Sequence, residues 1–367
     1  MVRVILVAGA RPNFMKIAPL MRAAKAAGID YRLVHTGQHY DYEMSQTFFD
    51  DLGMGKPDYF LNAGSGSHAE QTASIMLAFE KVCLEWKPDW VLVVGDVNST
   101  LACAIVSKKL HINVAHVEAG LRSFDRTMPE EINRLVTDSI SDLCFVTEMS
   151  GEENLLKENH PKSRVHFVGH VMIDNLLYQK DVLEQFDVSS FAHGGDKPEA
   201  GPYAFMTLHR PSNVDSVETL GSIVEAIGTV AKEMPVIFPV HPRTRKKIDE
   251  FGMALPKNIV QLPPLGFRES LWFWKDAQVV FTDSGGLQEE TTALRVPCVT
   301  IRENTERPVT VEVGSNVLSG ISTKAIRAAY NQALEKGKTS RIPEKWDGKA
   351  SERIWSILQD VQGGETR

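Results

Sequence analysis

The chain has 367 residues, a length at which two domains of about 150 to 200 residues are expected. Hydrophobic residues make up 43% and charged residues 24%, a globular balance that excludes a disordered or collagen-like chain. The formal net charge is −7 at pH 7 and no basic block is present, so we expect no nucleic-acid partner.

Cysteine usage and the amino terminus indicate the compartment. Four cysteines are spread along the chain and form neither a C-x-x-C pair nor a disulfide-rich pattern. The amino terminus is apolar for only a few residues before Gly9, which is too short for a signal peptide core or a membrane-spanning helix. We therefore expect a reduced, cytoplasmic compartment and no membrane contact.

Short, continuously apolar runs recur in the first half of the chain and alternate with helical patterns. Such runs are typical of parallel strands covered by helices on both faces. Strands are predicted at Val2–Val7, Arg32–Thr36, Trp90–Val94, Val114–Val117, Leu143–Thr147 and Val165–Val168. Helices are predicted at Met15–Ala27, Ala69–Trp86, Ser99–Lys109 and Pro129–Ser141. This alternation predicts an α/β fold of βαβ units.

The alternation breaks after residue 169. A helical segment, Val171 to about Phe186, leads into the polar, Gly- and Pro-bearing stretch Ser189–Pro202, where the chain leaves the first domain. We expect a first domain at 1–169 and a second at 170–349. The second strand series is predicted at Tyr203–Leu208, Pro235–Val240, Ile259–Leu262, Gln278–Thr282 and Cys298–Ile301.

Ligands of doubly wound sheets bind beyond the carboxyl ends of the strands, so we sought chemistry there. The run Asp283–Glu290, DSGGLQEE, follows a strand and opens a helix. Its two glycines let the backbone approach a ligand, and the helix N-terminus offers free N–H groups to a diphosphate. Glu290 could hold ribose hydroxyls. The structural alternative is a turn in which Asp283 or Ser284 caps the helix.

The known nucleotide-binding fingerprints are missing. Neither G-x-G-x-x-G nor a P-loop occurs, which disfavours NAD-linked redox chemistry and ATP hydrolysis, and we expect no cofactor. Instead, Arg11 lies beside a tight turn with Lys16 about one helical turn later, so both could face a phosphate. A solvated helix start is the alternative.

Three carboxylates, Asp96, Glu118 and Glu130, lie at or after consecutive strand ends of the first domain. Buried together, they would repel one another and lose hydration, which raises at least one pKa and suits proton transfer. Helix caps or buried salt bridges are the alternative.

Glu130 has a neighbour, Glu131, that points in another direction on a helix, so only one of them can readily face a ligand. Thr127-x-x-Glu130 also fits a capping box, which would make Glu130 structural. Arg134, four residues on, could pair with Glu130 and orient it. Both a capping role and a catalytic role of Glu130 therefore stay open.

The second domain carries cationic groups at its strand ends. His209-Arg210 and His241-Pro242-Arg243 could neutralise phosphate charge, and Arg307 supplies a further guanidinium. Histidines satisfied inside a core are the alternative. The histidines lack metal-ligand spacing, so we predict no metal.

In this order, the motifs resemble those of the non-hydrolysing UDP-N-acetylglucosamine 2-epimerases. The resemblance covers most of the chain. The motifs that carry it are Gly9-Ala10-Arg11-Pro12 with Lys16, Gly37-Gln38-His39, Gly95-Asp96, His116-Val117-Glu118-Ala119-Gly120-Leu121-Arg122, Pro129-Glu130-Glu131-x-Asn133-Arg134, His209-Arg210, Pro239-Val240-His241, Asp283-Ser284-Gly285-Gly286-x-Gln288-Glu289-Glu290 and Thr305-Glu306-Arg307-Pro308.

The resemblance implies a GT-B-like fold of two Rossmann-like domains facing a cleft, with a C-terminal helix at about 350–367 packing back on the first domain. It implies interconversion of UDP-GlcNAc and UDP-ManNAc through a glycal, supplying precursors for surface polysaccharide, and a homodimer. Implied catalytic residues are Asp96, Glu118, Glu130 and His209. Implied UDP-sugar ligands are Arg11, Lys16, His241, Ser284, Gly285, Gly286, Glu290 and Arg307.

Two features depart from the family pattern. Where many members read G-T-R-P-E-A-I-K, this chain reads GARPNFMK, which keeps Arg11 and Lys16 in altered surroundings. Members activated by a second substrate molecule carry an Arg-Gln pair, whereas this chain has Asp41 after its Gln-His segment and Glu70-Gln71. We therefore expect no allosteric activation by substrate.

Other readings stay open on sequence alone. An epimerase for another UDP-2-acetamido sugar, such as a 2,3-diacetamido uronate, would share these motifs, as would a hydrolysing relative that releases free N-acetylmannosamine. A retaining glycosyltransferase of the same architecture would need an acceptor. A non-catalytic nucleotide-sugar binding protein would need fewer strand-end acids.

Overall fold

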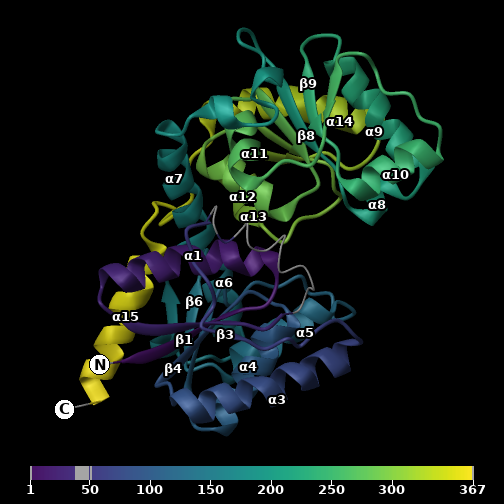
Figure 1. Ribbon diagram of the computed structural model, residues 1–367. Helices are drawn as coiled ribbons and strands as arrows, with labels where there is room; N and C mark the ends of the chain where they lie inside the picture. Colours follow the sequence, from purple (N-terminus) through teal and green to yellow (C-terminus); the bar gives the residue numbers. More distant parts are fainter. Residues whose placement is uncertain (1, 38–48, 50–51, 366–367) are drawn as a thin grey trace. The chain divides into compact units, whose positions relative to one another are not determined.

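The structure is a computed structural model that describes residues 2–37, 49 and 52–365, with the backbone alone at 11, 12 and 363–365. The chain forms two compact units (Figure 1). Unit 1 comprises Met1–Leu177 and Glu344–Arg367, and unit 2 comprises Tyr178–Pro343. None of the helices in the described part has both the length and the apolar character that a membrane crossing requires.

Unit 1 is built on a parallel sheet whose strand order, among the described residues, is β3-β2-β1-β4-β5-β6-β7. The chain runs outward from β1 on one side and from β4 on the other, as in a Rossmann fold. The strands are β1 (Arg3–Ala8), β2 (Asp30–His35), β3 (Tyr59–Phe60), β4 (Trp90–Val94), β5 (Asn113–Val117), β6 (Leu143–Val146) and β7 (Val165–Phe167). The helices are α1 (Arg11–Ala26), α3 (His68–Trp86), α4 (Asn98–Lys109), α5 (Pro129–Ile140), α6 (Met149–Lys157), the short η1 (Lys162–Arg164), α7 (Val171–Glu184) and α15 (Ala350–Glu365).

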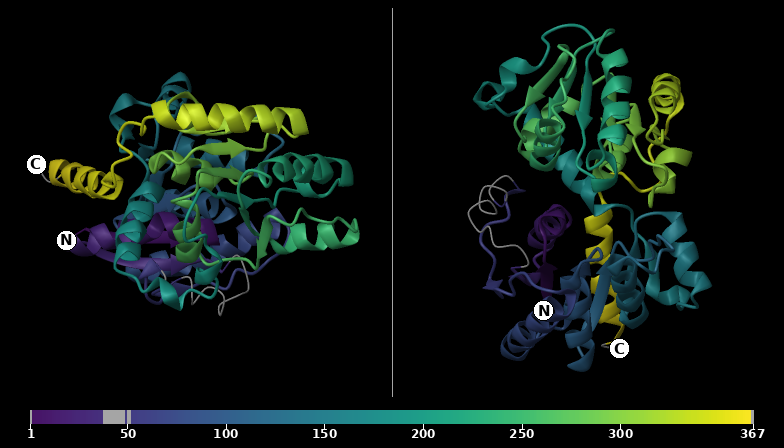
Figure 2. Two further views of the ribbon diagram at one scale, coloured as in Figure 1. Left: turned by 90° about the horizontal axis from the view of Figure 1, so that it is seen from above. Right: turned by 90° about the vertical axis from the view of Figure 1, so that its right-hand side faces the viewer.

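Helices cover both faces of this sheet because its strands are apolar on both sides. In β1, Ile5 and Val7 belong to a buried cluster with side chains of α3 and α4, whereas Val4 lies near Trp355 of α15. Helix α15 packs against α1 (Figures 1 and 2), and Trp355 Nε1 donates to Leu20 O at 2.9 Å. The carboxyl-terminal helix therefore belongs to the core of unit 1.

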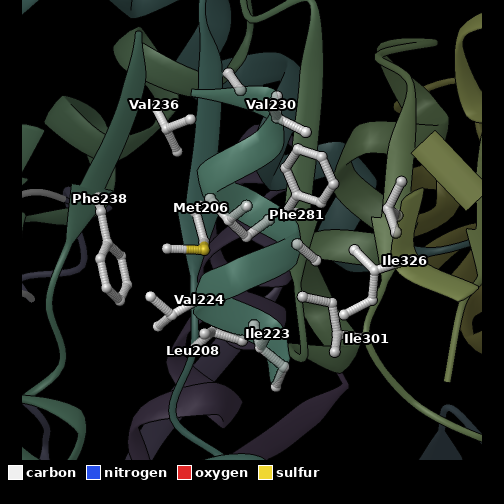
Figure 3. Close-up of a cluster of buried hydrophobic side chains, with 14 of the residues drawn as sticks. Met206, Leu208, Ile223, Val224, Val230, Val236, Phe238, Phe281, Ile301 and Ile326 are labelled. Atoms are coloured by element: carbon white, nitrogen blue, oxygen red, sulfur yellow. The ribbon is translucent and has the colours of Figure 1, made fainter. Parts of the chain in front are cut away.

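Unit 2 repeats the topology, with strand order β10-β9-β8-β11-β12-β13 in the described residues. Its strands are β8 (Ala204–Thr207), β9 (Val236–Pro239), β10 (Ile259–Leu262), β11 (Val279–Thr282), β12 (Cys298–Thr300) and β13 (Asn316–Leu318). Its helices are η2 (Val188–Ser190), η3 (Gly194–Asp196), α8 (Pro211–Val214), α9 (Val217–Val230), α10 (Pro242–Glu250), α11 (Phe267–Trp274), α12 (Gly285–Ala293), α13 (Pro308–Glu312) and α14 (Thr323–Thr339). Figure 3 shows its core, where Met206 of β8 and Phe281 of β11 pack against Ile223 of α9 and Ile326 of α14.

The predicted strands and helices lie close to those observed, and two short strands were missed. Strands β3 and β13 have 2 and 3 residues at sheet edges, too few to form an apolar pattern. We expected divisions after residues 169 and 349, whereas the units divide after Leu177 and Pro343. Helix α7 runs unbroken across the first division. At the second, Lys345 Nζ donates to Phe167 O at 2.8 Å, which binds this segment to unit 1.

Candidate active site

Asp96 directly follows Gly95 at the carboxyl end of β4, where two side chains of α5 hold it. Arg134 Nη2 lies 2.5 Å from Asp96 Oδ2, and Asn133 Nδ2 donates to the Asp96 carbonyl at 2.8 Å. Asp96 is half-buried. The Asp96 carboxylate is thus paired with a guanidinium, a partly buried ion pair of the kind that the sequence left open as an alternative.

Glu118 follows β5, the neighbouring strand, and its backbone has φ of +72°, a left-handed conformation that is rare for a non-glycine residue. Its N–H and that of Ala119 both donate to Phe145 O, at 3.0 and 3.1 Å. The Glu118 carboxylate lies 2.6 Å from Lys16 Nζ of α1, and both side chains are buried. Lys16 is therefore the counter-ion of Glu118, a contact that sequence reasoning did not foresee.

The two adjacent glutamates at the start of α5 have different surroundings. Glu131 is buried, accepts N–H bonds from Ser123 at 2.9 Å and Phe124 at 3.1 Å, and pairs with Arg134 at 2.8 Å. These contacts hold its pKa below the usual range although burial opposes ionisation. Glu130 is half-buried and has no hydrogen bond or ion pair with a residue that the structure describes.

Two interactions of α5 that the sequence left open do not form. Arg134 does not pair with Glu130, because residues three apart, not four, meet here and Arg134 reaches Glu131 and Asp96 instead. The capping box also does not form. Helix α5 begins after Met128 without a side-chain cap, and Thr127 Oγ1 donates to Asp125 instead. Glu131 anchors the preceding loop, which leaves the Glu130 carboxylate available to a ligand.

In unit 2, His209 is positioned by the buried carboxylate of Asp283, which lies after β11. His209 Nδ1 lies 2.9 Å from Asp283 Oδ1, and the backbone N–H groups of His209 and Arg210 donate to the same carboxylate at 3.0 and 2.9 Å. Burial opposes ionisation of Asp283, but the His209 contact and the backbone N–H groups outweigh it and lower its pKa. With Nδ1 held in this way, Nε2 is the His209 nitrogen left to meet a ligand.

Asp283 was read from sequence only as a possible helix cap. It does not cap α12, whose N-cap is Ser284 without a side-chain bond. Asn213 Nδ2 also reaches Asp283 Oδ2, at 3.3 Å, and Ile301 O, at 2.9 Å, which ties α8 to both strand ends. The position of Asp283 directly after an apolar strand was the feature of the sequence that could have predicted this anchoring role.

The N-terminus of α12 brings together several predicted diphosphate ligands. Ser284, Gly285 and Gly286 form the first turn, where helix N–H groups lack intrahelical acceptors. A Cβ added to Gly285 would lie 3.0 Å from Arg307 Nη1, so the glycine admits the guanidinium to this turn. Arg307 is held by Glu289, at 2.8 Å. The turn thus combines helix-end donors with a cation, the chemistry that a phosphate requires.

Glu290 lies on α12 one position after Glu289 and is buried. Burial, together with the charge of Glu289, raises the pKa of Glu290 to about 8. Glu290 is therefore mostly protonated at neutral pH and can donate as well as accept a hydrogen bond. A group of this kind suits the hydroxyls of a ribose.

The remaining predicted residues differ in how far the structure describes them. The exposed His241 caps α10 by accepting from Arg243 N at 3.2 Å, and its ring lies 5.7 Å from that of His209. Partial burial and the neighbouring His209 lower the pKa of His241. Arg11 begins α1, but its side chain lies outside the described part, as do Gln38, His39, Tyr40 and Asp41. Among the described residues, no cluster of His, Cys, Asp or Glu is arranged to hold a metal.

Two Rossmann-like units, one with acids at its strand ends and one with a guanidinium beside a helix N-terminus, fit the GT-B-like fold class. The family model described as UDP-N-acetylglucosamine 2-epimerase matches residues 21–359. The chain therefore belongs to the UDP-N-acetylglucosamine 2-epimerase family, an isomerase family, which confirms the resemblance and the fold class drawn from sequence.

Individual relatives are similar along nearly their whole length. The UDP-N-acetylglucosamine 2-epimerase of Methanocaldococcus jannaschii is 42% identical over 360 residues, covering 96% of this chain and 98% of the relative. Its crystal structure in complex with UDP-GlcNAc and UDP matches with a TM-score of 0.86, covering 98% of this chain and 99% of that one. The UDP-2,3-diacetamido-2,3-dideoxy-D-glucuronate 2-epimerase of Pseudomonas aeruginosa is 38% identical, covering 97% of this chain and 99% of the relative.

Proposed function

We propose that this chain interconverts UDP-GlcNAc and UDP-ManNAc by eliminating UDP and adding it back. One observation carries the proposal: Asp96 and Glu118 follow adjacent strands of unit 1, each paired with a basic side chain, while in unit 2 Arg307 lies beside the N-terminus of α12. The M. jannaschii relative, which is 42% identical, was crystallised with UDP-GlcNAc and UDP, and this supports the choice of ligand.

The chemistry requires both kinds of group. No carbonyl acidifies the C2 hydrogen of the sugar, so direct deprotonation would face a prohibitive barrier. If the C1–O bond breaks first and UDP leaves with the bonding electrons, positive charge develops at C1 and the C2 proton becomes acidic. A carboxylate then removes that proton to give a glycal. Return of UDP to C1, with a proton delivered to the opposite face of C2, gives the epimer.

Each group has a role in this proposal. Cations and helix N–H groups stabilise the departing diphosphate, where His209, oriented by Asp283, would act together with Lys16 and His241. Asp96, Glu118 and Glu130 would share the proton transfers, and Glu290 would hold the ribose. The remaining UDP ligands would be Arg11, Ser284, Gly285, Gly286 and Arg307.

Incubation with UDP-GlcNAc alone in deuterated water, followed by NMR of the sugar, tests the reaction. We expect UDP-ManNAc carrying deuterium at C2. Product without deuterium would exclude elimination, and net release of free UDP and N-acetylmannosamine would indicate the hydrolysing relative. Asp96→Asn should lose turnover while it keeps UDP affinity, whereas a binding protein would show no turnover to lose. Sugar transfer that occurs only with an acceptor would indicate a glycosyltransferase.

A second substrate is favoured by one specific finding. The P. aeruginosa relative at 38% identity is named for a UDP-2,3-diacetamido uronate. Elimination and re-addition at C1 and C2 would serve that sugar equally well. Measuring kcat/KM for both UDP-sugars under the same conditions decides between them, and we expect UDP-GlcNAc to give the higher value.

We also propose that no second substrate molecule activates this chain, because Glu70-Gln71 stands where such members carry an Arg-Gln pair. Glu70 forms a capping box with Ser67: Ser67 N donates to Glu70 Oε2 at 2.9 Å, and Glu70 N to Ser67 Oγ at 3.2 Å. Gln71 is buried and accepts from Asn98 Nδ2 at 2.8 Å. We therefore propose that activity depends hyperbolically on substrate concentration. From the family resemblance and the cysteine usage we also propose a cytoplasmic homodimer. Initial rates and light scattering test these two points, and sigmoidal kinetics would contradict the first.

A further inference from the structure

A buried network of His116, Asp138 and Arg122 lies beside the two turns that carry Asp96 and Glu118. His116 is on β5, Asp138 is on α5, and Arg122 follows β5. The His116 and Asp138 side chains are fully buried and that of Arg122 is 1% exposed. Burying polar and charged groups in a core costs desolvation free energy, so their contacts with one another must offset that cost.

His116 joins the end of β4 to α5. Its Nε2 lies 2.8 Å from Gly95 O, and its Nδ1 lies 2.6 Å from Asp138 Oδ1. A carbonyl oxygen can only accept a hydrogen bond, so Nε2 carries a proton and donates to Gly95 O. The next residue is Asp96. The imidazole therefore restrains the peptide group that leads into the first acid.

Asp138 is contacted by donors from β5 and from the turn that follows it. Besides His116, it accepts from Arg122 Nη2 at 2.7 Å and from Gly120 N at 3.1 Å. Burial opposes ionisation of Asp138, but the contacts with His116 and Arg122 outweigh it and lower its pKa. Arg122 is held in turn by Glu158, at 2.8 and 2.7 Å. Asp138 thus fixes the turn that follows Glu118.

The turn at Glu118 needs such support. Glu118 has φ of +72°, a conformation that persists in a non-glycine residue only where the surroundings enforce it. Gly95 and Gly120 have φ of +66° and +78°, which glycine adopts without strain. A Cβ on Gly120 would lie 2.3 Å from Gly151 O, so this turn is also closely packed. On the same helix as Asp138, Arg134 and Asn133 hold the carboxylate and carbonyl of Asp96.

We propose that His116, Asp138 and Arg122 are positioning residues for the acids Asp96 and Glu118: through Gly95 O and Gly120 N they set where each carboxylate meets the sugar. This inference rests on the catalytic roles proposed for the two acids. A purely structural role would make loss of the network lower stability alone. Displacement of a reacting group by about 1 Å can cost about 100-fold in rate, so a positioning role is measurable in kcat.

Two substitutions at one position separate the contacts of His116. In His116→Gln, the amide nitrogen takes the place of Nε2 and keeps the bond to Gly95 O, whereas in His116→Asn it takes the place of Nδ1 and keeps the contact with Asp138. We expect kcat to fall about 100-fold in H116N and no more than about 10-fold in H116Q. Both should melt at similarly lowered temperatures. Equal kcat values in the two variants would overturn the proposal.

Asp138→Asn and its matched control give a second, independent comparison. Asp142 accepts from Val114 N at 2.8 Å and pairs with Lys108 at 2.7 Å, at the opposite end of the same strand β5. We expect D138N to lose about 100-fold in kcat and D142N to keep kcat within about 2-fold, although both lose stability. D138N with a kcat as high as D142N would overturn the proposal.

Two controls keep the outcomes distinct. Each kcat is normalised to the fraction of protein that binds UDP, because the UDP site proposed for unit 2 does not use the network. A histidine variant that fails to melt cooperatively is replaced by the Asp138 and Asp142 pair. The unsubstituted chain is assayed first on both UDP-sugars. If it turns over neither, the proposed function fails, whereas a variant result can fail only the positioning role.

Discussion

The ammonium of Lys16 lies 2.6 Å from the carboxylate of Glu118, and both side chains are buried in unit 1. Gly95 makes this approach possible, since a Cβ at that position would lie 2.9 Å from Lys16 Nζ. The pair joins α1 to the end of β5. One of the proposed catalytic acids is therefore held beside an ammonium group.

Replacing Lys16 by Met should lower the free energy of unfolding by about 3 kcal/mol, because it leaves Glu118 buried without its counter-ion. The double variant Lys16→Met/Glu118→Gln should recover at least about half of that loss, since no unpaired charge then stays buried. Urea denaturation measures both values. A single variant as stable as the unsubstituted protein would show that the pair contributes nothing.

Gly95→Ala should lower both stability and kcat more than its matched control, Gly28→Ala. Both glycines have φ of +66°, so alanine meets the same backbone strain at either position. Only at Gly95 does the new Cβ meet Lys16 Nζ, whereas nothing lies within 4 Å at Gly28. We expect G28A to cost about 1 kcal/mol with kcat intact. Thermal melts and measurements of kcat test this prediction. Equal effects of G95A and G28A would show that crowding against Lys16 Nζ contributes nothing.

We expect substitution of Glu130 to lower activity and substitution of the adjacent Glu131 to lower stability. Glu131→Gln weakens the contacts with Arg134 and the N–H groups of Ser123 and Phe124, so we expect it to lose about 2 kcal/mol of stability. Glu130→Gln should keep the stability of the unsubstituted protein and lose at least about 100-fold in kcat. The opposite assignment, with E130Q fully active, would remove Glu130 from the proposed acids.

Glu290 should make stability depend on pH. Its pKa is raised to about 8 from the ordinary value of 4.5, so between those values the folded state binds more protons than the unfolded state. Stability contributed by this group is therefore greatest at low pH and falls as the pH rises towards about 8. Glu290→Gln should flatten that fall by on the order of a few kcal/mol. Urea titrations at several pH values measure the difference, and parallel curves would contradict it.

Much of the fold was readable in the sequence. Continuous apolar runs such as Trp90–Val94 and Val279–Thr282 identify buried parallel strands, and Asp96 and Asp283 follow the carboxyl ends of these strands, where doubly wound sheets in general bind ligands. The order of these motifs was enough to indicate the family. The edge strand Asn316–Leu318 escaped because a run of 3 residues has no pattern of its own.

Side-chain partners could not be read in the same way. Helical spacing suggested that Arg134 orients Glu130, yet Arg134 contacts Glu131 and Asp96. Asp283 looked like a helix cap and instead holds His209. Asp138, in the last turn of α5, carries no motif that would have marked it, although three other residues donate to it.

By itself, then, the sequence determined the strand and helix periods, the family and the candidate acids, because these depend on residues within a few positions of one another. Only the tertiary structure decided that Lys16 meets Glu118 and that His116 bonds to Gly95 and Asp138. Those partners are brought together by the packing of α1, β4, β5 and α5, and the burial of each charge then allows few other arrangements.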